Sequence, residues 1–217
     1  MSLTAAPVNP AVVPTSGNSW QVRHDSFNAI ASQGGIDLLF LGDSITDGWN
    51  RQGKQIWAER YEPLKAANFG IGGDKTENVL WRLQNGNLDG IRPKVVVLLV
   101  GTNNIFRDTA PEIAEGVTAI VKEIRTRSPS TKVLLFGIFP RNQKPDEPVR
   151  AKITAVNNII AKLEDGREVF FFDIGKKFLE PDGTLPKSIM GDSLHPNPVG
   201  YQIWADAMQG KLDELLK

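Results

Sequence analysis

Five short, strongly apolar segments recur along this chain, and each is separated from the next by a segment of helical character. Apolar runs of about four to eight residues bounded by turn residues are typical of buried strands. The predicted strands are 37–41, 66–69, 95–100, 132–137 and 168–173. Strands that alternate with helices favour a parallel sheet, because each right-handed crossover places a helix on one face or the other. The sequence therefore predicts an α/β fold.

The segments between these runs carry the periodicity of amphipathic helices. One apolar stripe is preceded by Thr109 and Glu112, which stand at capping-box distance. A second stripe spans 149–163, and Asn197-Pro198 predicts the start of the last helix, as N-cap and first helical residue. The first stripe consists of positions 113, 117, 120, 121 and 124.

The length and the net charge of the chain limit the number of domains and the kinds of partner to be expected. A chain of 217 residues fits one domain, predicted over 19–217, with a flexible segment over 1–18 before it. The 25 basic residues balance the 25 acidic ones, so the chain carries no electrostatic footprint for nucleic acid. No apolar run is long enough to span a bilayer.

The absence of Cys excludes thiolate catalysis, Cys-ligated zinc and disulfides. Residues 1–17 lack the basic and continuous apolar regions of an intact signal peptide. They fit an ordinary flexible terminus and also the mature start of an exported protein, so both a cytoplasmic and an exported location stay open.

Ser44 ends the sequence Gly-Asp-Ser directly after the first predicted strand, at the edge where ligands bind in open α/β sheets. A serine hydroxyl is a weak nucleophile until a base removes its proton. Of the two histidines, His24 has no acidic residue at a spacing that indicates a catalytic pair, and it is predicted to be a surface or packing residue. His195 follows Asp192 by three residues, which allows the carboxylate to reach the imidazole. Asp43 is predicted to hold the turn.

Acyl transfer also needs hydrogen-bond donors aimed at the developing oxyanion. The backbone N–H of Ser44 is one candidate. Gly73 ends a Gly-rich turn before a helix that Asp74 and Glu77 are expected to cap, and Asn103 follows the third strand. A structural interpretation stays open for each motif taken alone, since Gly-rich turns accommodate positive φ and Asn commonly caps turns.

Three better-known motifs do not fit the chain. A Walker A loop needs Gly directly before Lys75-Thr76, where Asp74 stands. A dinucleotide-binding loop needs a third Gly at Lys75, and the G-x-S-x-G elbow needs Gly where Thr46 stands.

Taken together, the four blocks resemble those of the SGNH hydrolases, also called GDSL esterases and lipases. They occur in the family's order and span nearly the whole chain from Ile36. The likeness to the catalytic-subunit type of platelet-activating-factor acetylhydrolase Ib extends beyond the motifs, over 68–74, 79–86 and 92–104. Bacterial acetyl esterases that act on carbohydrates carry the same blocks.

The resemblance implies a flavodoxin-like three-layer α/β/α sandwich with a five-stranded parallel sheet. It implies Ser44 as the nucleophile, His195 as its base and Asp192 as the residue that orients His195. It further implies an oxyanion hole made of the Ser44 and Gly73 N–H groups and the Asn103 amide, and it suggests a homodimer.

By position, the resemblance also implies that Ile45, Thr102 and Leu194 line the acyl pocket. Ile45 stands where the family usually has Leu, a change that affects the shape of the pocket rather than the chemistry. The loop Pro140–Pro148 lies at the same edge and is a candidate for substrate specificity. Trp49 and Phe106 are expected to pack in the core or at the rim, with stacking on a sugar ring as the alternative.

The expected function is hydrolysis of short-chain, chiefly acetyl, carboxylic esters, with a carbohydrate O-acetyl ester as one candidate substrate. This chemistry needs no metal or cofactor. One alternative is a lysophospholipase or thioesterase that prefers longer acyl groups. Another is a catalytically silent binding domain on the same fold. Sugars, phospholipid glycerol and small alcohols are all compatible with the alcohol half of the substrate.

Overall fold

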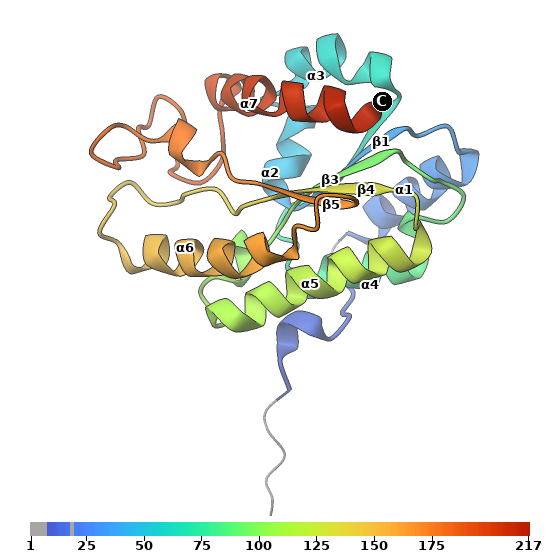
Figure 1. Ribbon diagram of the computed structural model, residues 1–217, viewed down its shortest axis with the longest axis horizontal. Coiled ribbons are helices and arrows are strands. Elements are labelled where there is room, and N and C mark those ends of the chain that lie inside the picture. Colours follow the sequence, from blue (N-terminus) through green and yellow to red (C-terminus); the bar gives the residue numbers. More distant parts are fainter. Residues whose placement is uncertain (1–7, 18–19) are drawn as a thin grey trace, which may run out of the picture.

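The computed structural model describes residues 8–17 and 20–217 and has a five-stranded parallel sheet at its centre (Figure 1). The strand order is β2-β1-β3-β4-β5. Each predicted strand is confirmed, with ends that differ by no more than one residue. The strands are β1 (Leu38–Gly42), β2 (Ala66–Gly70), β3 (Val95–Leu99), β4 (Lys132–Phe136) and β5 (Val169–Phe172).

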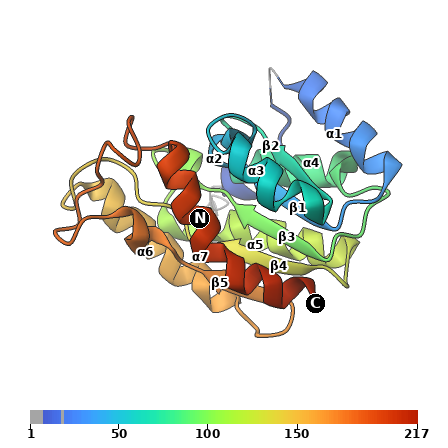
Figure 2. The ribbon, with the colours of Figure 1, turned by 90° about the horizontal axis from the view of Figure 1, so that it is seen from above.

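Helices cover both faces of the sheet and complete the predicted three-layer α/β/α sandwich. Helices α4, α5 and α6 lie on one face and α3 and α7 on the other (Figures 1 and 2). In the part of the chain that the structure describes, no helix combines the length and apolarity needed to cross a membrane. The α-helices are α1 (Gln21–Gln33), α2 (Ser44–Asp47), α3 (Lys54–Arg60), α4 (Thr76–Arg82), α5 (Ala110–Arg127), α6 (Pro148–Ile160) and α7 (Pro198–Leu216).

Alternate residues of each strand supply two separate cores. In β1, Leu39 and Leu41 pack with α4, α5 and α6, whereas Leu38 and Phe40 pack with α3 and α7. A parallel strand buried on both faces reads as a continuous apolar run, because neither side meets water. This explains why short apolar runs marked the strands so clearly in the sequence.

Capping residues fix the starts of two predicted helices. The Thr109 N–H donates to the Glu112 carboxylate over 2.7 Å, and the Glu112 N–H donates back to the Thr109 hydroxyl over 3.4 Å. At α7 the Asn197 side chain accepts from the Gly200 N–H over 3.1 Å, with Pro198 in the first turn. Both predicted helix starts are confirmed.

The predicted cap of α4 is wrong. Lys75, rather than Asp74, is the N-cap, and its N–H donates to the Asn78 side chain over 2.9 Å. Asp74 is instead fully buried and pairs with Arg82. A capping pattern in the sequence cannot reveal that a carboxylate is engaged by a residue eight positions away.

The described part of the N-terminal segment packs on the domain. Ala11 is fully buried, and its carbonyl accepts from the Thr76 hydroxyl over 2.9 Å. The Thr15 N–H donates to the carbonyl of Glu77 over 3.2 Å. Of the segment 1–18 that the sequence predicts to be flexible, residues 1–7 and 18 lie outside the described residues.

The strand order determines where a ligand can bind. The chain passes from β1 to β2 on one side and then returns to β3 on the other. Ligands of open α/β sheets bind at the carboxyl edge where the order reverses in this way. Ser44 follows β1 and Asn103 follows β3, so the two residues flank this point.

Candidate active site

Ser44 begins the short helix α2 directly after β1. The Asp43 carboxylate caps this helix, accepting from the Ile45 N–H over 2.9 Å. Gly42 is required by close approach, because a Cβ there would lie 2.1 Å from the Leu99 carbonyl oxygen of β3. Together these contacts place a partly exposed serine at the carboxyl edge of the sheet.

The three predicted catalytic residues form a continuous chain of hydrogen bonds. The Ser44 Oγ lies 2.8 Å from His195 Nε2, and His195 Nδ1 lies 2.6 Å from Asp192 Oδ2. The second carboxylate oxygen of Asp192 accepts from the backbone N–H groups of His195 and Leu194, over 2.7 and 3.0 Å. The structure thus brings together residues that are about 150 positions apart in the sequence.

These hydrogen bonds also favour the charged form of Asp192. Partial burial raises the pKa of its carboxyl, but the hydrogen bonds from the His195 side chain and the two backbone N–H groups lower that pKa overall. An ionised carboxylate at His195 Nδ1 leaves Nε2 free to accept the Ser44 proton.

Of the predicted oxyanion donors, Gly73 lies on an exposed turn, whereas Asn103 is half-buried on the turn after β3. Gly72 and Gly73 are both exposed, and Gly73 has a φ of +83°, a region that favours glycine. A Cβ on Gly72 would lie 3.9 Å from the Ser44 Cβ, so this turn passes next to the serine. The Asn103 amide donates to the Asp74 carbonyl over 2.9 Å, which fixes its orientation and leaves its second N–H for a ligand.

The residues predicted to line the acyl pocket differ in exposure. Ile45 is 1% exposed and packs in the core beneath α7, and Thr102 is 2% exposed, whereas Leu194 is partly exposed. Trp49 is fully buried, so the alternative that it stacks on a sugar ring is wrong. Phe106 is 71% exposed, at the rim of the site rather than in the core.

Two further residues have the packing roles that the sequence predicted for them. His24 is 2% exposed and lies within hydrogen-bond distance of the Asn28 and Asn87 side chains, so it is buried rather than on the surface. Asp43 is 1% exposed and holds the turn at Ser44. Burial, and more weakly the nearby Asp74 carboxylate, raise the pKa of Asp43 to about 7, against the opposing effect of the Ile45 N–H and of Arg141.

The raised pKa of Asp43 predicts a defined pH dependence of stability. In the folded state the Asp43 carboxyl keeps its proton up to about pH 7, whereas an unfolded Asp releases it at about pH 4. The contribution of Asp43 to stability is therefore complete below about pH 4 and is lost as the pH rises to 7.

The variant Asp43→Asn tests this dependence, because it keeps the hydrogen-bond acceptor for the Ile45 N–H without the charge. As the pH rises from 4 to 8, we expect the unfolding free energy of the variant to increase by more than about 1 kcal/mol relative to that of the wild type.

Urea unfolding at a series of pH values measures this effect. Asp146→Asn is the matched control, because Asp146 is exposed on the loop before α6. We expect the control to follow the wild-type curve. Parallel curves for Asp43→Asn and the wild type would contradict the assignment.

A buried ion pair lies beneath the Gly-rich turn. Arg82 Nε donates to Asp74 Oδ2 over 2.8 Å, and both side chains are fully buried. The remaining Arg82 nitrogens donate to the Asn87 side chain over 2.7 Å and to the Gly42 carbonyl over 3.2 Å. Arg82 therefore joins the end of β1 to the turn that carries Gly73. No sequence motif pointed to this residue.

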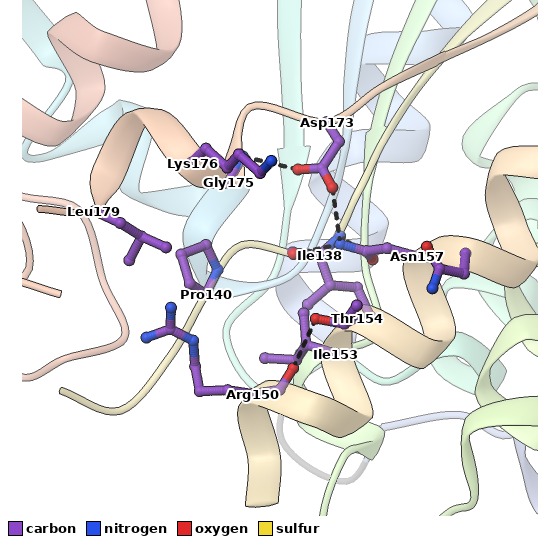
Figure 3. A pocket seen from close by; sticks show the side chains of 11 residues that line it. Ile138, Pro140, Arg150, Ile153, Thr154, Asn157, Asp173, Gly175, Lys176 and Leu179 are labelled. Carbon is purple, nitrogen blue, oxygen red and sulfur yellow. Dashed lines mark hydrogen bonds between the residues drawn. The ribbon is translucent and has the colours of Figure 1, made fainter. Parts of the chain in front are cut away.

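The surface next to the Gly-rich turn is hollowed. Two open grooves meet at Gly72, one extending past Trp20 and Arg23 and the other past Thr15 and Lys75. A separate cavity of about 330 Å³ lies between α6 and the segments that follow β4 and β5 (Figure 3). It is lined by Pro140 of the loop Pro140–Pro148, but by none of the predicted catalytic, oxyanion or acyl-pocket residues. Within the described residues, no cluster of three or more His, Asp or Glu side chains is arranged to hold a metal ion.

Comparison with known proteins identifies the family. The family model for GDSL-like lipases and acylhydrolases matches residues 40–203, which include every predicted catalytic and oxyanion residue. The chain belongs to the GDSL-like lipase/acylhydrolase family. It is a carboxylic ester hydrolase.

Individual relatives agree with this membership. The acylhydrolase is 41% identical to platelet-activating factor acetylhydrolase IB subunit alpha2 of Rattus norvegicus over 200 residues, which cover 89% of this chain and 86% of the relative. An acylhydrolase structure from Bacteroides fragilis, described as putative, matches with a TM-score of 0.77 at 20% identity, over 93% of this chain and all of the other. An acetyl-xylooligosaccharide esterase of Geobacillus, solved as a mutant, matches with a TM-score of 0.66 at 19% identity, over 82% and 94% of the two chains. The two structural matches show a shared fold.

Proposed function

We propose that this GDSL-like acylhydrolase is a serine esterase in which Ser44, His195 and Asp192 act as a catalytic triad. The observation that carries the proposal is the unbroken chain of hydrogen bonds from the Ser44 Oγ through His195 to Asp192. A hydroxyl held 2.8 Å from an imidazole nitrogen that is oriented by a carboxylate is the arrangement of an activated nucleophile.

The first half of the reaction forms an acyl-enzyme. The Ser44 Oγ attacks the ester carbonyl carbon while its proton passes to His195 Nε2. The carbonyl oxygen becomes an oxyanion, which the Ser44 and Gly73 N–H groups and the Asn103 amide stabilise. When the tetrahedral intermediate collapses, the C–O bond to the alcohol breaks and His195 gives its proton to the leaving oxygen.

The second half regenerates the enzyme. Water attacks the acyl carbon and passes a proton to His195 Nε2. The second intermediate then collapses, the bond to Ser44 Oγ breaks, and the serine recovers its proton from His195 as the acid leaves. Asp192 holds the imidazole and stabilises its positive charge in both halves.

We propose a preference for short acyl groups, chiefly acetyl. The near-complete burial of Ile45 and Thr102 supports this preference, because neither side chain opens a space that could hold a long acyl chain. The 41% identity to a platelet-activating factor acetylhydrolase subunit also supports it. A carbohydrate acetyl ester and a phospholipid acetyl ester are both compatible with the open surface around Gly72.

The homodimer that the resemblance suggests stays a prediction. A measurement of the molar mass in solution tests it.

A series of p-nitrophenyl esters tests the acyl preference. We expect kcat/KM to be highest for the acetate, to fall for the butyrate, and to be lower by about 10-fold or more for the octanoate, since even one methylene that the pocket rejects costs about 1–3 kcal/mol. Faster hydrolysis of the octanoate would favour the lysophospholipase or thioesterase alternative. Inertness toward all three esters and toward a fluorophosphonate would favour the silent binding domain.

A further inference from the structure

Arg141 connects the segment after β4 to the turn that carries Asn103. Its Nη1 donates to the carbonyl oxygen of Thr102 over 3.0 Å and to the Thr102 hydroxyl over 3.2 Å. Thr102 directly precedes Asn103, whose own amide is held by the Asp74 carbonyl. The turn is therefore anchored from two sides, by the Gly-rich loop and by Arg141.

The Arg141 guanidinium is fixed by stacking rather than by an ion pair. Its Cζ lies 4.8 Å from the centre of the Phe106 ring, and the ring is 71% exposed. Among the described residues Arg141 forms no ion pair, and its Nε is buried without a hydrogen-bond partner. The charge of this side chain is thus not neutralised by direct contact with a carboxylate.

Two carboxyl groups of the site act on the charge of Arg141. Asp43 precedes the serine, and Asp192 orients His195; both act on the charge of Arg141 across space. The residue after Arg141 also reaches the catalytic loop, because the Asn142 N–H donates to the Ser193 carbonyl over 2.8 Å. The pair 141–142 therefore contacts both the turn of Asn103 and the loop of Asp192 and His195.

We propose that Arg141 is a positioning residue for ester hydrolysis. Through its two hydrogen bonds to Thr102 it holds the Asn103 amide where the oxyanion forms, and its positive charge favours the negative charge that develops there. Because Thr102 lies between Arg141 and the reacting atoms, Arg141 acts on the transition state and contributes little to substrate binding. This inference rests on the proposed esterase function.

Kinetics of Arg141→Met and Arg141→Lys on p-nitrophenyl acetate test the inference. We expect Arg141→Met to lower kcat by about 10- to 100-fold, which is less than the loss of one oxyanion donor, with KM changed by less than about two-fold. Arg141→Lys keeps the charge and one donor, so it is expected to recover part of the lost kcat. The lysine variant also keeps the test valid if the methionine variant does not fold.

A double-mutant cycle with Asn103→Ala separates positioning from general stability. Because Arg141 is proposed to act through Asn103, Arg141→Met is expected to lower kcat much less in the Asn103→Ala background than in the wild type. Fully additive losses, a rise in KM with unchanged kcat, or an unchanged kcat in Arg141→Met would overturn the inference.

Arg150→Met is the matched control. Arg150 also holds this region by bonding two backbone carbonyls, those of Asn142 and Gly183, but it does not contact Thr102. An equal loss of kcat in Arg150→Met would mean that the integrity of the loop, rather than the contact with Thr102, is responsible.

The experiment first establishes that the wild type has esterase activity and that this activity depends on Ser44. If that activity is missing, the proposed function fails; if it is present and Arg141→Met is unaffected, only this inference fails.

Discussion

Ser44→Ala is expected to lower kcat for p-nitrophenyl acetate by about four orders of magnitude or more, with little change in stability. The reason is that the alanine side chain has no oxygen to attack the ester and no proton to give to His195. The residual rate is expected to come from the oxyanion donors and from substrate binding alone. Steady-state kinetics together with thermal unfolding measure the two effects separately.

Thr46→Val is a suitable control for Ser44→Ala. Thr46 is another hydroxyl residue of α2, it is buried, and its Oγ1 has no hydrogen-bond partner among the described residues. Removal of this hydroxyl is expected to leave kcat within about two-fold, because the hydroxyl makes no hydrogen bond and takes no part in the proposed transition-state interactions. Equal activity of Ser44→Ala and the wild type would show that another group attacks the ester.

Arg82→Met is expected to lower the free energy of unfolding by about 3–5 kcal/mol, because it leaves the buried Asp74 without its cation. Burial already raises the pKa of Asp74 to about 6, against the opposing effect of Arg82. The substitution also removes the hydrogen bonds to Asn87 and to the Gly42 carbonyl. Urea unfolding at pH 8, where loss of the partner is most costly to Asp74, measures the change.

Arg60→Met provides the comparison for Arg82→Met. Arg60 also pairs with an aspartate, Asp206, over 2.7 Å, but both side chains are partly exposed. An exposed pair contributes about 0–1 kcal/mol, so Arg60→Met is expected to shift the unfolding midpoint only slightly. Equal shifts in the two variants would contradict a special role for the buried pair.

The sequence predicted the strands, and the edge of the sheet at which Ser44 and Asn103 lie, for specific physical reasons. Parallel strands covered on both faces are continuously apolar, so their positions are visible in the chain. Residues that follow such strands meet at one edge of the sheet, so Ser44 and Asn103 could be placed there from their strand positions alone. The spacing of Asp192 and His195 is local and needed no knowledge of the fold.

Features that depend on tertiary packing could not be predicted in the same way. The Asp74 carboxylate fits a capping pattern, but the fold turns it inward to a buried arginine. Ile45 adjoins the nucleophile in sequence, yet the short helix α2 directs its side chain into the core. Arg141 reaches Thr102 only because β3 and β4 are neighbours in the sheet. Each of these contacts joins segments whose proximity the local sequence does not encode.

The central claim is that Ser44 carries the acyl group during the reaction, and mass spectrometry of the trapped enzyme tests it most directly. The protein is mixed with p-nitrophenyl acetate, quenched in acid within the first turnovers, digested and analysed for acetylated peptides; the same protein is labelled in parallel with a fluorophosphonate. The account predicts that both groups are found on Ser44 and on no other residue, and that Ser44→Ala takes up neither. Acetyl or phosphonyl groups on a different side chain of a fully active enzyme would contradict it.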